Sequence, residues 1–157
     1  MRRKKGEYFK QIEGCPDPLV VNVKKRVNFS EVDLIRIVWH GRYPIYFEEG
    51  SAELGRRFGL SFKDYYKANI SAPIVQFHID YFQPLVLDEE FIVKASFVWC
   101  EGARLNTEFS IIKQDKSIAS AGFTVQMFLD TVSSEICIAS PLLLEQFRSK
   151  WKSGKFK

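Results

Sequence analysis

Hydrophobic residues follow two different periods along this chain. From Leu19 to Phe29 the odd positions are apolar, interrupted only by Lys25, which predicts a half-buried strand. From Pro44 to Phe58 apolar and small residues recur at steps of three and four, which predicts one long helix. Beyond about residue 70 the period returns to two. The pattern therefore predicts one strand, one helix and then a series of strands.

The second half of the chain is expected to form four consecutive strands joined by short turns. They cover residues 73–82, 90–100, 104–113 and 118–130, and residues 135–139 extend or pair with the last one. The last strand carries its apolar residues at odd positions, which include Ala121 and Phe123. A short helical turn is expected at residues 62–67. A C-terminal helix is expected to open at Ser140-Pro141 and to run through Trp151.

This order of elements indicates an α+β fold, because strands and helices do not alternate as they do in a doubly wound parallel sheet. We expect an antiparallel sheet of about five strands wrapped around one long central helix, followed by a short C-terminal helix. Such a sheet leaves its outer face and its edges partly bare, so a dimer or a tetramer is expected.

The central helix has sequence signals at both ends. Pro44 suits the first helical position, which makes Tyr43 the expected cap, and Gly59 is expected to end the helix in a left-handed conformation. The helix is apolar along one face and carries small residues, such as Gly50, in its middle. We therefore expect it to lie very close to the sheet.

Length and composition favour one ordinary globular domain spanning residues 1–157, with an N-terminal arm at 1–18 and a basic tail at 152–157. The chain has 157 residues, of which 46% are hydrophobic and 27% charged. No apolar run is long enough for a membrane span, and the start does not resemble a secretory signal. The three cysteines, Cys15, Cys100 and Cys137, form no CxxC pair, which favours reduced thiols and a cytoplasmic location.

The net charge of +4 comes with lysines and arginines gathered at both ends of the chain. Such ends are solvated arms in many proteins, but they could also attract the phosphates of coenzyme A or an acidic carrier protein. Because the basic residues flank the domain and form no stripe through it, nucleic acid is not expected as a partner.

Several classes of chemistry lack their sequence signals. The chain contains no GxSxG, GxxxxGK[ST] or GxGxxG motif. Its two histidines, His40 and His78, and its scattered cysteines supply a metal site poorly, so no metal and no resident cofactor are expected.

The connection into the central helix holds the best candidates for chemistry. Asp33 alone reads as a turn or cap residue, and His40 alone reads as a structural histidine. Together with a helix start at Tyr43-Pro44, however, they could bring a carboxylate, an imidazole and the electropositive helix end to one place. Such a site can polarise a carbonyl group and deliver water to it.

The segment VNFSEVDLIRIVWHGRYPIYFE, residues 27–48, resembles the hotdog-fold acyl-CoA thioesterases of the 4-hydroxybenzoyl-CoA thioesterase family. The matching features include the spacing of Asp33, His40 and Tyr43. Further matches are Gly59-Leu60-Ser61, Ile79-Asp80-Tyr81 with Pro84, and the acidic Asp88. The resemblance extends over residues 19–141 and implies the hotdog fold, independently of the order of elements derived above.

The resemblance implies roles for individual residues. It implies that Asp33 acts as the nucleophile or general base on a thioester and that His40 helps to position the substrate or water. Backbone amides near Gly41, Arg42 and Tyr43 would polarise the thioester carbonyl, and Trp39 could line the acyl pocket. Coenzyme A would then take part only as a portion of the acyl-CoA substrate.

The chain departs from the family pattern at two positions. Arg36 stands where the family has glycine, which removes backbone freedom and places a guanidinium beside the site or outward from it. Arg42 stands where asparagine is common. Two alternatives to an acyl-CoA thioesterase therefore stay open. One is the same fold acting on an acyl carrier protein, and the other is an acyl-binding module without activity.

Overall fold

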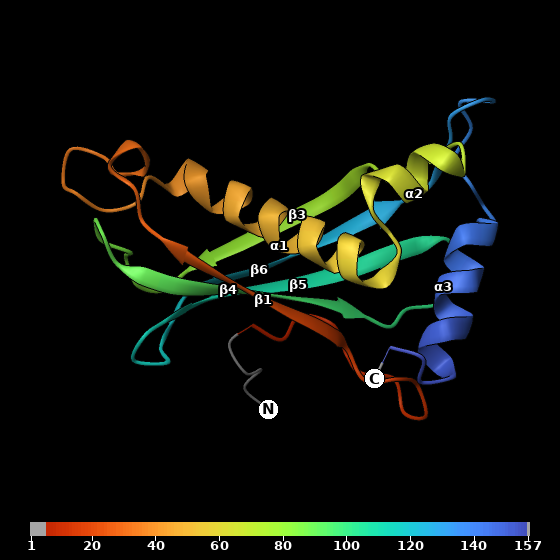
Figure 1. Ribbon diagram of the computed structural model, residues 1–157, viewed down its shortest axis with the longest axis horizontal. Helices are drawn as coiled ribbons and strands as arrows, with labels where there is room; N and C mark the ends of the chain where they lie inside the picture. The colour runs from red at the N-terminus through yellow and green to blue at the C-terminus, as the bar shows by residue number, and fades with distance from the viewer. Residues whose placement is uncertain (1–5, 157) are drawn as a thin grey trace.

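The structure, a computed structural model, describes residues 6–156 and contains the expected five-stranded antiparallel sheet (Figure 1). The strands lie in the order β1-β4-β5-β6-β3. Their bounds are β1 Leu19–Arg26, β3 Ile74–Tyr81, β4 Glu90–Val98, β5 Arg104–Lys113 and β6 Ile118–Met127. Two short strands, β2 (Ile70–Ser71) and β7 (Leu129–Asp130), form a separate pair. The helices are α1 (Tyr43–Phe58), α2 (Phe62–Lys67) and α3 (Leu142–Lys152), and the 3-10 turns are η1 (Phe29–Glu31) and η2 (His40–Arg42).

Helix α1 lies along the inner face of the sheet and packs mainly over β1 and β4 (Figure 1). The residues expected to mark its apolar face are all buried: Tyr43, Phe47, Gly50, Leu54 and Phe58. A Cβ atom at Gly50 would lie 2.9 Å from Ala95 Cβ and 3.1 Å from Val93 Cγ1. The close approach of helix and sheet therefore depends on the small residue at this position. Gly59 ends the helix at φ 84°, as expected.

Strand β6 turns its odd positions away from the helix. Its inner face carries Gly122, where a Cβ atom would lie 2.7 Å from Phe47 Cε2 and 2.1 Å from the carbonyl oxygen of His78. Because side chains alternate along a strand, Ala121 and Phe123 lie on the outer face of the sheet. This strand thus carries much of its apolar character on the side that faces away from α1.

The N-terminal arm covers part of that outer face. The backbone N–H groups of Tyr8 and Phe9 both donate to Glu108 Oε1, at 2.6 and 2.7 Å. Both aromatic rings pack against Phe123, with ring centroids 5.2 and 5.1 Å apart. The Tyr8 hydroxyl also donates to Asp80 Oδ2 on β3, at 2.7 Å. Residues 6–9 are therefore docked on the sheet and cover this part of its outer face.

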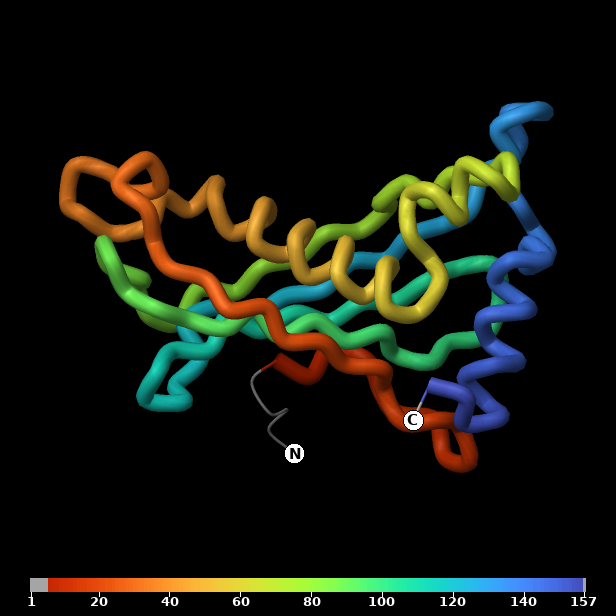
Figure 2. The backbone as a smooth tube through the Cα atoms, viewed as in Figure 1, coloured from red at the N-terminus to blue at the C-terminus, as the bar shows by residue number. Residues whose placement is uncertain are grey.

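Helix α3 lies at the end of the molecule opposite the loops that precede α1 (Figure 2). It buries Leu144, Phe147 and Trp151, and Trp151 Nε1 donates to the carbonyl oxygen of Asp17 at 2.9 Å. This bond ties α3 to the segment that leads into β1. No helix among residues 6–156 is long and apolar enough to cross a membrane.

Three predicted boundaries were wrong by a few residues. β1 ends at Arg26, not at Phe29, because the chain turns into η1 there. Tyr43 is the first residue of α1 and Arg42 caps it, because η2 runs directly into the helix. Helix α3 begins at Leu142, one position later than expected, because Pro141 has the extended ψ of 152°.

Candidate active site

Asp33 lies in a tight loop between η1 and η2. The backbones of Val32 and Val38 form an antiparallel bridge, and the Asp33 N–H donates to the Ile37 carbonyl at 2.9 Å. The Arg36 N–H donates back to the Asp33 carbonyl at 3.0 Å. One carboxylate oxygen of Asp33, Oδ1, accepts the N–H of Ile35 at 2.9 Å. This local bond fixes the direction of the carboxylate relative to its loop.

Arg36 keeps the backbone conformation for which glycine is best suited. Its φ is 63°, in the left-handed region that residues with a Cβ atom adopt at a cost of about 1–2 kcal/mol. The replacement of the family's glycine therefore leaves the turn in a left-handed shape. The Arg36 side chain is exposed.

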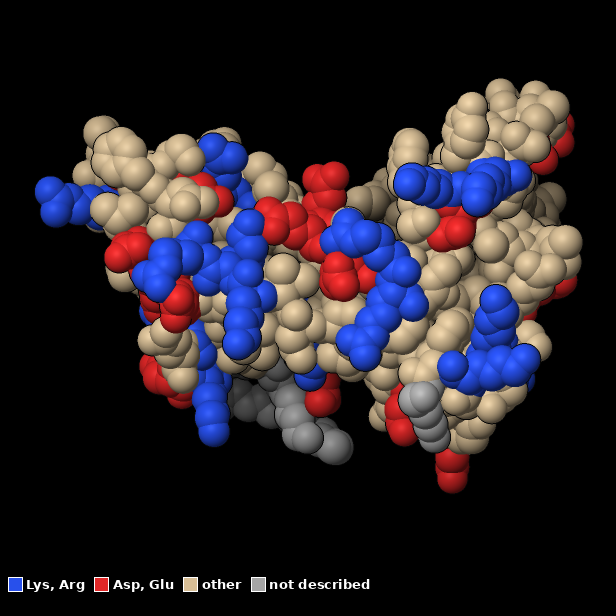
Figure 3. All heavy atoms as spheres, in the orientation of Figure 1, with Lys and Arg blue, Asp and Glu red and all other residues tan. Residues whose placement is uncertain are grey.

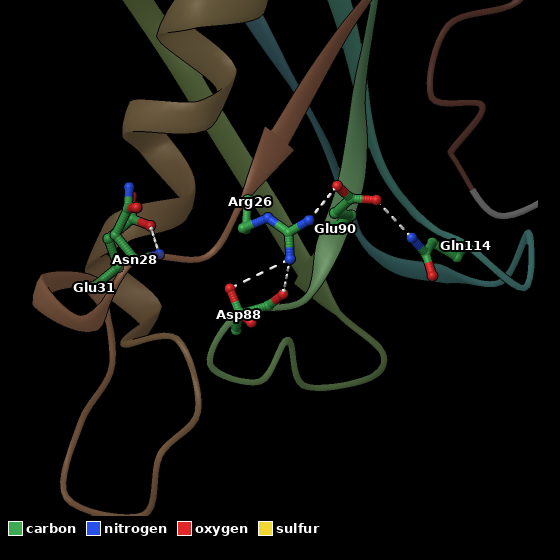
Figure 4. Close-up of polar contacts among 6 residues, drawn as sticks. All are labelled: Arg26, Asn28, Glu31, Asp88, Glu90 and Gln114. Atoms are coloured by element: carbon green, nitrogen blue, oxygen red, sulfur yellow. Dashed lines mark hydrogen bonds and ion pairs between the residues drawn. The ribbon is translucent and has the colours of Figure 1, made fainter.

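Polar contacts hold the base of this loop against the strand that begins at Glu90 (Figure 4). The Asn28 N–H donates to Glu31 Oε2 at 2.7 Å and closes η1. Arg26, at the end of β1, donates to the Asp88 carbonyl at 2.9 Å and forms an ion pair with Glu90. Gln114 Nε2 donates to the second oxygen of Glu90 at 2.8 Å. The segment that enters the Asp33 loop is therefore anchored to residues 88–90, and Gln114 in turn holds Glu90.

Asp33 shares a pocket of about 270 Å³ with the start of α1. The helix end contributes Arg42 and Ile45, and Trp39 forms another part of the wall. Arg42 Nη2 donates to the Ser30 carbonyl at 3.1 Å, which links η2 to η1. The expected meeting of Asp33 with the helix end is present. Arg42, and not Arg36, brings a guanidinium to this pocket.

His40 lies beside this pocket and does not line it. Its ring packs against Trp39, with centroids 5.0 Å apart, and its carbonyl accepts the Tyr81 hydroxyl at 3.0 Å. Gly41 is required for the Trp39 position, because a Cβ atom there would lie 2.3 Å from the indole ring. The Tyr43 side chain is buried, and this burial raises its pKa. Of the predicted site residues, Asp33, Trp39 and Arg42 thus line one pocket, while His40, Gly41 and Tyr43 support it.

The sequence analysis missed two contributors to this region. Ile45 lines the pocket from the first turn of α1, and Tyr81 ties β3 to the His40 carbonyl. Tyr81 belongs to the Ile79-Asp80-Tyr81 match and could have been noticed there. Ile45 carried no signal beyond its place in the first helical turn.

The electrostatics of the pocket suit a polarised carbonyl group. Because η2 leads into α1, the electropositive end of the combined helical segment lies at residues 40–42. A carboxylate from Asp33 and a guanidinium from Arg42 flank the same space. A carbonyl held by helix-end donors beside a carboxylate is an arrangement suited to nucleophilic or general-base attack. Within residues 6–156, no cluster of three or more histidine, cysteine or carboxylate side chains could hold a metal ion.

Comparison with known proteins places the chain in a family. Residues 27–147 match the model of the thioesterase-like superfamily. The chain is 31% identical to a Bacillus subtilis protein, YneP, whose name describes it as a candidate acyl-CoA thioesterase. The similarity extends over 67 residues, which are 43% of this chain and 49% of that protein.

Solved structures with the same fold include two proteins of Staphylococcus aureus. A DHNA-CoA thioesterase superimposes with a TM-score of 0.72 at 18% identity, covering 87% of this chain and 89% of that one. The protein SAV2348, solved in complex with CoA, superimposes with a TM-score of 0.76 at 17% identity, covering 91% of this chain and 89% of that one. The chain has the hotdog fold and belongs to the thioesterase-like superfamily of thioester hydrolases.

Proposed function

We propose that this protein hydrolyses acyl-CoA thioesters and that Asp33 is its catalytic carboxylate. The observation that carries the proposal is the pocket that Asp33 shares with Arg42 and Ile45 at the start of α1. A thioester carbonyl placed there would be polarised by the helix start near Gly41–Tyr43, where the Arg42 N–H is already engaged because it donates to the Trp39 carbonyl at 2.9 Å. The Asp33 carboxylate would attack the carbonyl carbon or activate a water molecule for that attack.

The leaving group fits this arrangement. The thiolate of CoA is a good leaving group, so the site needs no strong general acid to complete the reaction. Oriented donors supply the larger part of the stabilisation when negative charge develops on the carbonyl oxygen. In this proposal His40 positions the substrate or water.

We propose that the active form is a dimer that pairs through β3. Within residues 6–156, β3 is hydrogen-bonded to β6 on one side only, and it exposes Ile74, Val75, Phe77 and Tyr81. A two-fold pairing of β3 with a second copy would run antiparallel. It would bring the Tyr81 end of one copy, which adjoins His40, near the Ile74 end of the other. That end lies close to α2, where Phe62 and Tyr66 are 85% and 80% exposed.

Two further points complete the proposal. The three cysteines are free thiols, which supports a cytoplasmic location. On the face seen in Figure 3, lysine and arginine side chains are interleaved with aspartate and glutamate. That face therefore gives no preference for an acidic carrier protein over CoA.

The test is the turnover of acyl-CoA substrates by the Asp33→Asn variant. Asparagine keeps an oxygen that can accept the Ile35 N–H, so the loop should hold its shape. Loss of the carboxylate should lower kcat by about 10²–10⁴-fold. Asp115→Asn is a matched control, because Asp115 Oδ1 also accepts a backbone N–H two residues on, from Ser117 at 2.9 Å. Unchanged turnover in Asp33→Asn would refute the assigned role.

A panel of thioesters separates the remaining alternatives. Hydrolysis of an acyl carrier protein thioester with none of acyl-CoA would show that the carrier is the substrate. Absence of hydrolysis of every thioester by the wild-type protein would favour an acyl-binding module. A single-chain mass in solution would refute the pairing through β3.

A further inference from the structure

Arg42 is the one cation among the described residues that line the Asp33 pocket. Its Nη2 atom donates to the Ser30 carbonyl at 3.1 Å, and Ser30 lines the same pocket. This bond holds the guanidinium group at the pocket wall. Because a guanidinium has five N–H donors, most of them stay available for another acceptor.

The charge of Arg42 has no carboxylate partner in the part of the chain that the structure describes. Two acidic residues, Glu31 and Asp33, line the pocket with it, but neither forms an ion pair with its guanidinium. Glu31 Oε2 instead accepts the Asn28 N–H at 2.7 Å, and Asp33 Oδ1 accepts the Ile35 N–H at 2.9 Å. A guanidinium in this state is suited to bind a negatively charged oxygen of a ligand.

The backbone of the same residue cannot fill that role. The Arg42 N–H donates to the Trp39 carbonyl at 2.9 Å and belongs to the turn η2. A negative charge that develops in the pocket would therefore not receive this N–H. A hydrogen bond from a charged donor is also about twice as strong as one from a neutral amide.

We infer that the Arg42 guanidinium binds the thioester carbonyl oxygen and stabilises the negative charge that develops on it. The inference rests on the proposed thioesterase function and adds a catalytic residue to it. When Asp33 acts as the general base, it takes a proton from water while the water oxygen bonds to the carbonyl carbon. The π electrons of the carbonyl group move to its oxygen, which faces Arg42. As this intermediate collapses, the C=O bond re-forms, the C–S bond breaks, and the CoA thiolate takes the proton from Asp33.

The phosphates of CoA are the other anions that an arginine could bind. The whole pantetheine arm separates the thioester from the nearest phosphate, whereas Arg42 lines the same pocket as the carboxylate that would start the reaction. When the thioester lies beside Asp33, the carbonyl oxygen is therefore the acceptor within reach of Arg42.

The first measurement is the steady-state kinetics of Arg42→Gln with an acyl-CoA substrate. Glutamine keeps an N–H that can donate to the Ser30 carbonyl, so the link between η2 and η1 should remain. Loss of the charge should lower kcat by about 10²–10³-fold, as removal of one oxyanion donor does in other enzymes. KM should change less than about threefold, because the contact strengthens only in the transition state. Arg36→Gln, at an exposed position of the neighbouring loop, is the matched control and should behave like the wild type.

The second measurement is the affinity for two CoA analogues, obtained by calorimetry. One carries an S-trifluoroacetonyl group, whose hydrated ketone presents oxygens like those of the tetrahedral intermediate. The other carries an S-propyl group, which has no carbonyl. Arg42→Gln should weaken binding of the trifluoroacetonyl analogue by about tenfold or more and leave the Kd of S-propyl-CoA unchanged. Equal weakening for both analogues would mean that Arg42 contacts the CoA portion, which would overturn the inference.

If Arg42→Gln does not fold, Arg42→Ala is the second variant. Guanidinium added at millimolar concentration, far below the range that unfolds proteins, should restore its kcat by about tenfold, and an absence of recovery would overturn the inference. An unchanged kcat in Arg42→Gln, beside an active wild type, would overturn the inference and leave the proposed function standing. A wild-type protein that hydrolyses no thioester would refute the proposed function and the inference with it.

Discussion

Replacement of Gly122 by alanine should destabilise the protein and disturb the candidate site together. The added Cβ atom would lie 2.1 Å from the carbonyl oxygen of His78 and 3.1 Å from its carbonyl carbon, both on the neighbouring strand β3. A backbone carbonyl in a sheet cannot turn aside as a side chain can, so β3 must move away from β6. Overpacking of this kind costs about 3 kcal/mol.

Two measurements follow from this movement. For a chain of this size, about 3 kcal/mol corresponds to a Tm lower by about 6–12 °C, measured by circular dichroism. Because Tyr81 on β3 donates to the His40 carbonyl, kcat should also fall at temperatures where the variant is fully folded.

Gly50→Ala provides the comparison. Its Cβ atom would meet side-chain atoms only, 2.9 Å from Ala95 Cβ and 3.1 Å from Val93 Cγ1. Alanine also gains about 1 kcal/mol of helix propensity over glycine. This variant should therefore lose less stability than Gly122→Ala. A Tm for Gly122→Ala within about 1 °C of the wild type would refute the argument that the β3 backbone is rigid here.

Three further predictions concern single side chains. In steady-state assays, His40→Ala should lower kcat by about tenfold, a smaller loss than that of Asp33→Asn, because the backbone carbonyl that accepts the Tyr81 hydroxyl remains. A loss of kcat equal to that of Asp33→Asn would indicate that His40 acts as an acid–base group. Thr107→Val should raise Tm by about 2–4 °C, because the Thr107 hydroxyl is buried among the described residues without a hydrogen-bond partner. A lower Tm for the variant would show that the hydroxyl does have a hydrogen-bond partner. Burial raises the pKa of Glu108, so its contribution to stability is present below the ordinary pKa of glutamate and is lost as the pH rises through the raised value. The stability of Glu108→Gln relative to the wild type should therefore increase between pH 4 and 7 in denaturant titrations, and a decrease would contradict this assignment.

Much of the fold was predictable, because local periodicity determines it. The buried face of α1 from Tyr43 to Phe58 and its end at Gly59 follow directly from residue spacing. Which residues of β6 face α1 was harder to predict, because apolar residues at every second position can point to either face of the sheet. Contacts distant in sequence decide it: Phe47 fills the space above Gly122, and the N-terminal arm covers Phe123.

The candidate site was predictable in outline only. The spacing of Asp33 and Tyr43 correctly placed a carboxylate near a helix start. Which arginine reaches the pocket was not visible in the sequence, because it depends on the left-handed turn at Arg36 and on the bond from Arg42 to Ser30. The position of His40 depends on Tyr81, 41 residues away. The catalytic roles of these residues stay predictions until the variants are measured.

The pairing of β1 with β4 has a consequence for how the protein is made on the ribosome. Leu19 pairs with Phe97 and Arg26 with Glu90, so the first strand has no neighbour in the sheet until β4 has been synthesised. At about 5–20 residues per second, the nascent chain would carry β1 without its partner strand for roughly 4–15 seconds. Slow codons between these strands should therefore increase aggregation, whereas slow codons after β6 should not.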